Sequence, residues 1–139
     1  MIARKVAGGY LVRLEKGEET VSSLSSFIGR RRIGAGVIFG IGAIRNPKIG
    51  YFDAPRKSYR KTTIRKTVEV VSLSGNVSYL HGRPFVHLHV AVADDKYRLR
   101  GGHLFQAEVA VTLELYIRVF SRKLVRKPDP ETGFNFWQL

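Results

Sequence analysis

Three of the four histidines in this 139-residue chain lie close together in the sequence. His87 and His89 alternate with apolar residues within residues 84–92, and His103 follows two glycines. On a strand, His87 and His89 would point to the same side with origins about 6–7 Å apart. A third imidazole from an adjacent strand would complete a three-histidine metal site with an open fourth position, as in reactive zinc centres. The alternative is three unrelated histidines that satisfy hydrogen bonds or surround a pocket without metal.

Two strands must hold these side chains. Residues 85–92 alternate strictly, and the side opposite the histidines is expected to face the core through Val86, Leu88, Val90 and Val92. Residues 104–120 alternate over a length that predicts two consecutive strands or one bent strand. The expected core positions there are Phe105, Ala107, Val109, Val111, Leu113, Leu115, Ile117 and Val119. His103 shares their parity, so a bulge at Gly101 and Gly102 is needed to point it away from the core.

The remaining pattern predicts further strands and one helix. Strands are expected at 9–14, 34–44, 48–52, 67–73 and 77–80, with a turn at 46–47 and a turn or bulge at 74–76. Apolar residues at helical spacing from Val21 to Ile28 predict a helix, capped by Thr20 or Ser22. The arginines at 30–32 would complement the negative end of its dipole.

Positive charge is the strongest global signal. Lys and Arg total 24 against 11 Asp and Glu, a formal charge of +13, which favours a polyanionic partner such as nucleic acid. The densest stretch has an aromatic residue, Tyr59, and no acid, and its candidate phosphate contacts are Arg56, Lys57, Arg60, Lys61, Arg65 and Lys66. The alternative is a solvated basic loop or an edge strand that blocks unwanted pairing. Further candidate cations follow in the tail at Arg122, Lys123, Arg126 and Lys127.

Composition excludes several classes of protein. The chain has no cysteine, which excludes disulfides, thiolate metal sites and cysteine nucleophiles. It has no apolar run long enough to cross a membrane and no secretory signal pattern at its start, so a cytoplasmic location is expected. The aromatic cluster at 134–137 is expected either to fold back onto the body or to dock on a neighbouring subunit.

Several motifs together resemble one family. They are Glu-Val-Val-Ser-Leu-Ser-Gly-Asn-Val at 69–77, Gly-Arg-Pro-Phe-Val-His-Leu-His-Val at 82–90 and Gly-Gly-His-Leu at 101–104. Earlier in the chain, Glu-Lys-Gly-Glu-Glu at 15–19 precedes the helix, and Gly-Ile-Gly-Ala at 40–43 is followed by Ile-Gly-Tyr-Phe at 49–52. In this combination the chain resembles the plants-and-prokaryotes-conserved (PPC) domain over roughly residues 9–120.

This resemblance implies an α/β (α+β) fold: a single compact domain over 1–139, with a mostly antiparallel or mixed β-sheet flanked by helices. The core would span about 9–120, with a basic and aromatic tail at 121–139, and the domain would form a homotrimer. Prokaryotic members stand alone and are named DNA-binding proteins, and some bind a metal such as zinc through three histidines, here His87, His89 and His103. Plant members add AT-hooks, but residues 81–84 read His-Gly-Arg-Pro instead of Arg-Gly-Arg-Pro and are not counted as one.

Three functions follow as hypotheses. The first is nonspecific or regulatory nucleic-acid binding through the basic surface. The second is a zinc-dependent small-molecule-binding protein or enzyme using the three histidines, with Glu69 as a candidate base. The third is a structural trimeric assembly module. The sequence identifies no catalytic residue, and we expect a binding protein rather than an enzyme.

Overall fold

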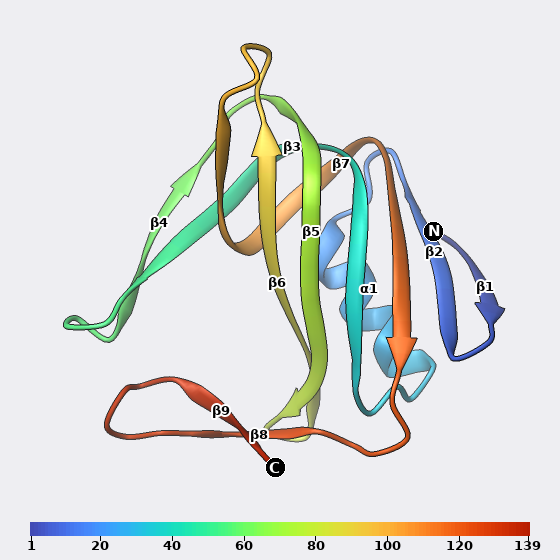
Figure 1. The fold of residues 1–139 in the computed structure, drawn as a ribbon, viewed down its shortest axis with the longest axis vertical. Coiled ribbons are helices and arrows are strands. Elements are labelled where there is room, and N and C mark those ends of the chain that lie inside the picture. Colours follow the sequence, from blue (N-terminus) through green and yellow to red (C-terminus); the bar gives the residue numbers. More distant parts are fainter.

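Long strands dominate the computed structural model, which describes residues 1–139 (Figure 1). Four of the strands have eleven or more residues, and only one helix is present. The elements in chain order are β1 (Ile2–Val6), β2 (Gly9–Glu15), α1 (Thr20–Arg30), β3 (Gly36–Asp53), β4 (Ser58–Thr63), β5 (Thr67–Leu80), β6 (Arg83–Ala93), β7 (Leu99–Val119), β8 (Val125–Pro128) and β9 (Asn135–Gln138).

The four longest strands form a closed circuit of antiparallel pairs. β3 pairs with both β5 and β7, and β6 also pairs with both β5 and β7. β2 and then β1 extend the sheet beyond β7, and β4 forms a hairpin with β3 (Figure 1). This circuit brings β6 and the beginning of β7 together, and these are the segments that carry the histidines.

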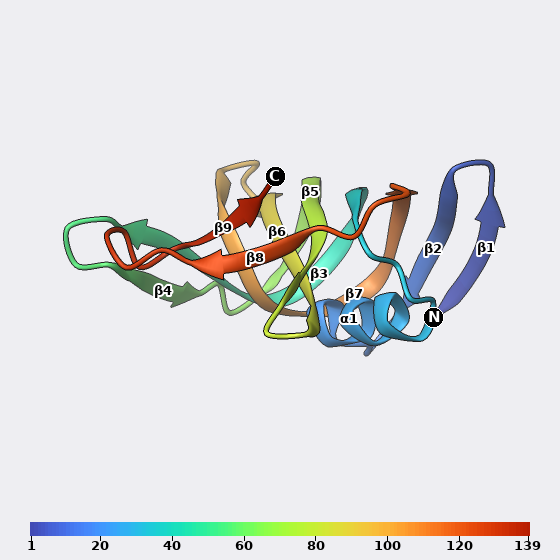
Figure 2. The same cartoon turned by 90° about the horizontal axis from the view of Figure 1, so that it is seen from below.

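Helix α1 covers one side of the sheet (Figure 2). Leu24, Phe27 and Ile28 are buried and join a core of 24 residues, as their helical spacing predicts. The predicted cap is wrong, because Glu19 holds this position and its carboxylate accepts the backbone N–H groups of Val21 and Ser22. The expectation of several flanking helices is also wrong, because α1 is the only helix.

Two predicted interruptions are continuous strand. β3 runs through the turn expected at 46–47, where Asn46 takes a φ of +51° and the pairing with β7 shifts register. β5 runs through 74–76, because Gly75 serves a close approach between strands and not a turn. A Cβ on Gly75 would lie 2.2 Å from the carbonyl oxygen of His87 on β6.

β7 is one bent strand, and the bulge next to His103 is not at the glycines. Lys48 of β3 pairs with Gln106 while Ile49 pairs with Leu104, so the extra residue on β7 is Phe105. This bulge reverses the parity of the strand, which buries Leu104 and leaves Phe105 only half-buried. The prediction is wrong for two of the listed core positions, because Phe105 is only half-buried and Val111 is exposed, whereas Val119 is partly buried and packs against the core. The core positions predicted on β6 are all buried.

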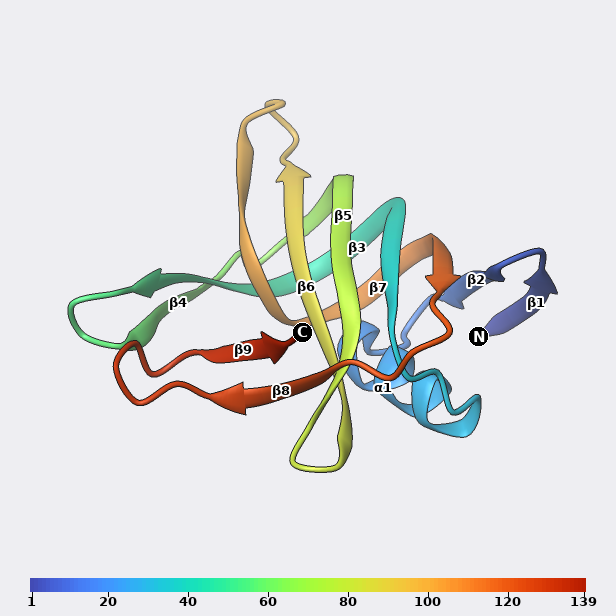
Figure 3. The same ribbon diagram turned by 60° about the horizontal axis from the view of Figure 1, so that its bottom comes forward.

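The C-terminal hairpin of β8 and β9 folds back onto the body (Figure 3). β8 pairs in parallel with the end of β5 through Tyr79 and Leu80. Phe134 stacks edge-on against Phe52 with ring centroids 4.6 Å apart, while Trp137 remains 41% exposed. No helix in the structure combines the length and apolar character needed to cross a bilayer.

Candidate metal centre and its pocket

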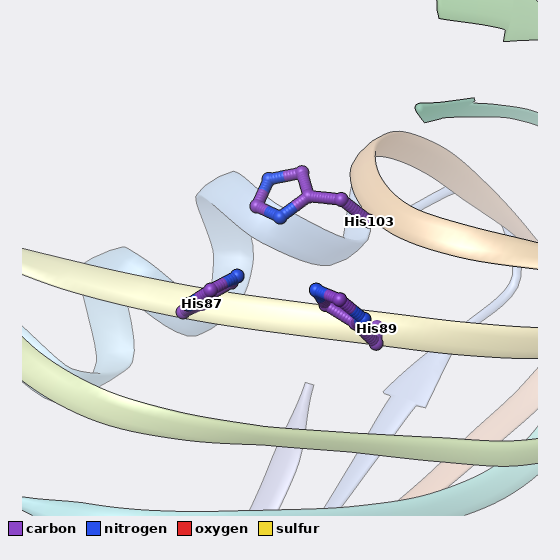
Figure 4. A group of neighbouring side chains, drawn as sticks. All are labelled: His87, His89 and His103. Atoms are coloured by element: carbon purple, nitrogen blue, oxygen red, sulfur yellow. The ribbon is translucent and has the colours of Figure 1, made fainter. Parts of the chain in front are cut away.

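The structure brings the three predicted histidines together (Figure 4). His89 of β6 pairs directly with His103 of β7, and His87 lies two residues earlier on β6. Their ring centroids are 4.8–5.5 Å apart, and one ligand nitrogen from each lies within 4.8 Å of the others. His81 occupies the β5–β6 turn with a φ of +48° and takes no part in this group.

Glycines and the bulge on β7 set this geometry. Gly102 has a φ of +148°, and a Cβ there would lie 2.6 Å from the carbonyl oxygen of Gly50 on β3. On the other side, a Cβ on Gly101 would lie 2.4 Å from the carbonyl oxygen of Val90. The glycines therefore let β7 fit between β6 and β3, while the bulge at Phe105 puts His103 on the face opposite the core residues that follow.

Burial has left part of this histidine group without partners. The Nε2 atom of His87 and the Nδ1 atom of His103 are buried and make no hydrogen bond. Burial lowers the pKa of both imidazoles to about 4. Repulsion between neighbouring imidazoles when both are protonated lowers each pKa further, chiefly through His103 for His87 and through His89 for His103. Both rings are therefore neutral at pH 7, the state that binds metal.

This donor set fits a divalent metal ion. A buried polar atom without a partner costs about 1–3 kcal/mol, and a shared cation would satisfy two such atoms at once. Three neutral imidazoles also match the ligand preference of zinc in sites that keep one position open.

A cavity of about 400 Å³ adjoins His87 and His103. Its wall is largely aromatic, formed by Phe52, Tyr59, Phe85, Phe105 and Phe134. The rings of Tyr59 and Phe105 lie 5.0 and 4.4 Å from that of His103, centroid to centroid. A ligand at an open metal position would therefore have an apolar surface beside it.

Arg126 of β8 also lines the cavity, a role that the sequence did not reveal. It was expected among the exposed tail cations but is only 7% exposed, because β8 pairs with the end of β5. Its Nη2 atom donates to Asn76 Oδ1 at 2.9 Å and lies 3.4 Å from His87 Nδ1. Since a guanidinium only donates, Nδ1 of His87 is the acceptor in this contact. Binding a metal through Nε2 would place the ring proton on Nδ1 and so break the contact with Arg126.

The predicted phosphate contacts are only partly free. They lie on the β3–β4 hairpin and the segment after it, and one of them, Lys57, also lines the cavity beside His87 and His103. Arg56 and Arg60 both pair with Asp53, and Lys66 pairs with Asp94 and Asp95. The remaining three form no ion pair with a carboxylate: Lys57, Lys61 and Arg65.

The candidate base Glu69 does not reach the site. It is exposed on β5 and pairs with Ala93, four residues beyond His89 on β6. It is also absent from the lining of the cavity.

Comparisons with known proteins point to one family. The model of the Plants and Prokaryotes Conserved (PCC) domain matches residues 1–121. A "putative DNA binding protein" from Bacteroides thetaiotaomicron is 29% identical with a TM-score of 0.95, covering 99% of this chain and 96% of that one. A metal-containing protein from Archaeoglobus fulgidus is 35% identical with a TM-score of 0.88, covering 100% and 99%. A plant- and prokaryote-conserved protein from Pyrococcus horikoshii is 34% identical with a TM-score of 0.88, covering 99% and 94%.

A curated relative is much longer than this chain. The bifunctional protein GlmU of Synechococcus is 30% identical over an alignment 133 residues long, which covers 90% of this chain and 19% of that protein. The chain thus spans about a fifth of that relative's length.

The neutral histidines should make the metal-free protein sensitive to acid. In the unfolded chain His87 and His103 take up protons near pH 6.5, but in the folded protein they do so only near pH 4. The free energy of unfolding is therefore unaffected by these two groups above pH 6.5 and falls as the pH drops from 6.5 to 4. Each histidine can lower the free energy of unfolding by at most about 1.4 kcal/mol for each pH unit in that range. Urea unfolding of chelator-treated protein between pH 7 and 4 tests this, and the double variant His87→Asn/His103→Asn should show a shallower fall. An equal slope in both proteins would contradict the assignment.

Proposed function

This chain belongs to the Plants and Prokaryotes Conserved domain family, and on that premise we propose that it is a metal-dependent small-molecule-binding protein. His87, His89 and His103 would hold a divalent ion, which we propose to be zinc. The observation that carries this proposal is the convergence of three imidazoles, two of which have a buried nitrogen without a partner. The likeness to a metal-containing protein of Archaeoglobus fulgidus supports it.

Each part of the site would have a separate role. A bound zinc ion would supply a Lewis-acidic position for a ligand atom. His87 and His103 remain neutral at pH 7 and so keep their lone pairs available. The aromatic wall of the cavity would exclude water and pack against the body of the ligand. We assign no catalytic residue, and the proposal is therefore one of ligand binding.

Nonspecific nucleic-acid binding is a second proposed function. The likeness to a protein named for DNA binding and the net charge of +13 support it. The β3–β4 hairpin projects from the body and carries most of the candidate cations (Figure 1). Lys57, Lys61 and Arg65 would be the main phosphate contacts, because none of them forms an ion pair with a carboxylate.

Assembly into a homotrimer is proposed from the exposed face of the sheet. Leu11, Phe39 and Ile41 are each more than half exposed, and the first two alternate with core residues of β2 and β3. They line one groove with Val71 and Tyr116, and this groove contains no Lys or Arg. Copies with a charge of +13 could therefore meet there without bringing cations together. A second copy of this chain is the proposed occupant.

For the metal site, protein purified without added metal should contain about one zinc ion per chain. His87→Ala, His89→Ala and His103→Ala should each weaken zinc binding by more than the roughly 10- to 100-fold typical of outer-shell changes. Elemental analysis and titration with a competing zinc indicator provide the measurement. His81→Asn is the matched control, since asparagine tolerates a positive φ and this histidine lies outside the group. Unchanged zinc affinity in His103→Ala would refute the site.

For nucleic acid, affinity for a short DNA duplex should fall steeply with salt. The variant Lys57→Gln/Lys61→Gln/Arg65→Gln should reduce the slope of log affinity against log salt by about 2–3, near 0.9 per lost phosphate contact. Fluorescence anisotropy of labelled duplex at several salt concentrations measures it. The control removes the same charge from exposed positions on β1 and β2: Arg4→Gln/Lys5→Gln/Arg13→Gln. Equal slopes in the two triple variants would exclude the hairpin as the contact surface.

For assembly, sedimentation at micromolar concentration should give the mass of three chains. Ile41→Lys should release folded monomers, because it places a charge in the apolar groove. Tyr97→Lys is the control, since Tyr97 is 90% exposed and lies outside that groove. A wild-type monomer, or a trimer unaffected by Ile41→Lys, would count against this face.

A further inference from the structure

Arg126 is a buried cation without a counter-ion. No carboxylate pairs with it, although the residue is only 7% exposed. Its acceptors are all neutral: Ser78 Oγ, the backbone oxygen of Asn135, Asn76 Oδ1 and His87 Nδ1. Burying a charge is costly unless an opposite charge accompanies it, so the position favours an anion.

The surrounding cavity shares this positive character. Lys57 also lines it, and its ammonium donates only to the backbone oxygen of Pro130, at 3.3 Å. None of the fourteen lining residues is Asp or Glu. A guanidinium has five N–H donors, and the four contacts of Arg126 leave one on Nη1. The cavity therefore contains two cations, Arg126 and Lys57, and Arg126 has one N–H free to donate to a ligand. Aromatic side chains form the wall around them.

We propose that this cavity binds a small molecule whose oxyanion, a carboxylate or a phosphate, lies against Arg126 and whose apolar body packs on the aromatic wall. This inference rests on the proposed function, because it takes the cavity beside the histidines to be the site of the small molecule. It does not require the metal, because both cations belong to this chain. An oxyanion would restore charge balance at Arg126 and accept its remaining N–H.

A purely structural role for Arg126 makes a different prediction. Its guanidinium lies over the rings of Phe85 and Trp137, 5.3 and 5.5 Å from their centroids, and it bonds to the tail at Asn135. These contacts could serve only to anchor the β8–β9 hairpin. An anchor would affect stability and the binding of neutral and charged molecules alike, whereas an oxyanion site affects charged ligands selectively.

The test compares benzoate and phenyl phosphate with neutral benzamide. Each is titrated into the full chain, both chelator-treated and zinc-loaded, and followed by NMR chemical shifts. At least one of the two anions should bind about tenfold or more tightly than benzamide in both preparations. Arg126→Gln should reduce affinity for that anion by about 10- to 100-fold, the value of a charged hydrogen bond, and leave benzamide nearly unchanged. The tighter anion identifies the group as carboxylate or phosphate.

Three variants keep the result interpretable. Arg122→Gln makes the same charge change at an exposed tail position and should leave all three affinities unchanged. Arg126→Lys should retain part of the preference for anions. If Arg126→Gln loosens the tail, seen as faster hydrogen exchange of the β8 and β9 amides, Lys57→Gln at an exposed position still tests the charge and should weaken anion binding severalfold.

The outcomes separate this inference from the metal site. Equal binding of benzamide and both anions, or an equal loss of all three in Arg126→Gln, would overturn the oxyanion site even in zinc-loaded protein. A protein that binds no zinc but keeps an anion preference dependent on Arg126 would refute the metal proposal and sustain this one.

Discussion

The pairing of β6 with β7 at His89 and His103 is the contact on which the rest of the site depends. It exists because four long strands close into a circuit, which forces β7 to lie between β6 and β3. Backbones approach so closely there that Cβ atoms at Gly101 and Gly102 would overlap neighbouring carbonyl oxygens. The same closure buries one nitrogen each of His87 and His103, which gives both rings their low pKa.

The electrostatic character of this region comes from burial more than from the total charge. Most of the excess cations are exposed, and several pair with Asp53, Asp94 or Asp95. In the cavity, by contrast, Arg126 has lost its water and has no acid beside it. A single buried cation in a low-dielectric site can influence a ligand more strongly than many solvated ones.

The tail contributes to the pocket although the family model ends at residue 121. Arg126, Phe134 and Asn135 all line the cavity, so the histidines lie within the matched region and part of the ligand wall lies beyond it. Under the proposed function, ligand preference would then depend on the tail while the metal ligands depend on the shared core. The two proposed surfaces, hairpin and pocket, also meet at Lys57, which lies in both.

The sequence by itself determined the helix, the core face of β6 and the side on which His87 and His89 lie, because these follow from the local periods of 3.6 and 2 residues. It also indicated His103 as their companion. Only the tertiary structure decided that the bulge lies at Phe105, since register depends on the partner strand. It alone placed Arg126 inside, because the burial of one tail cation among four depends on where β8 meets β5, and no local pattern records this contact.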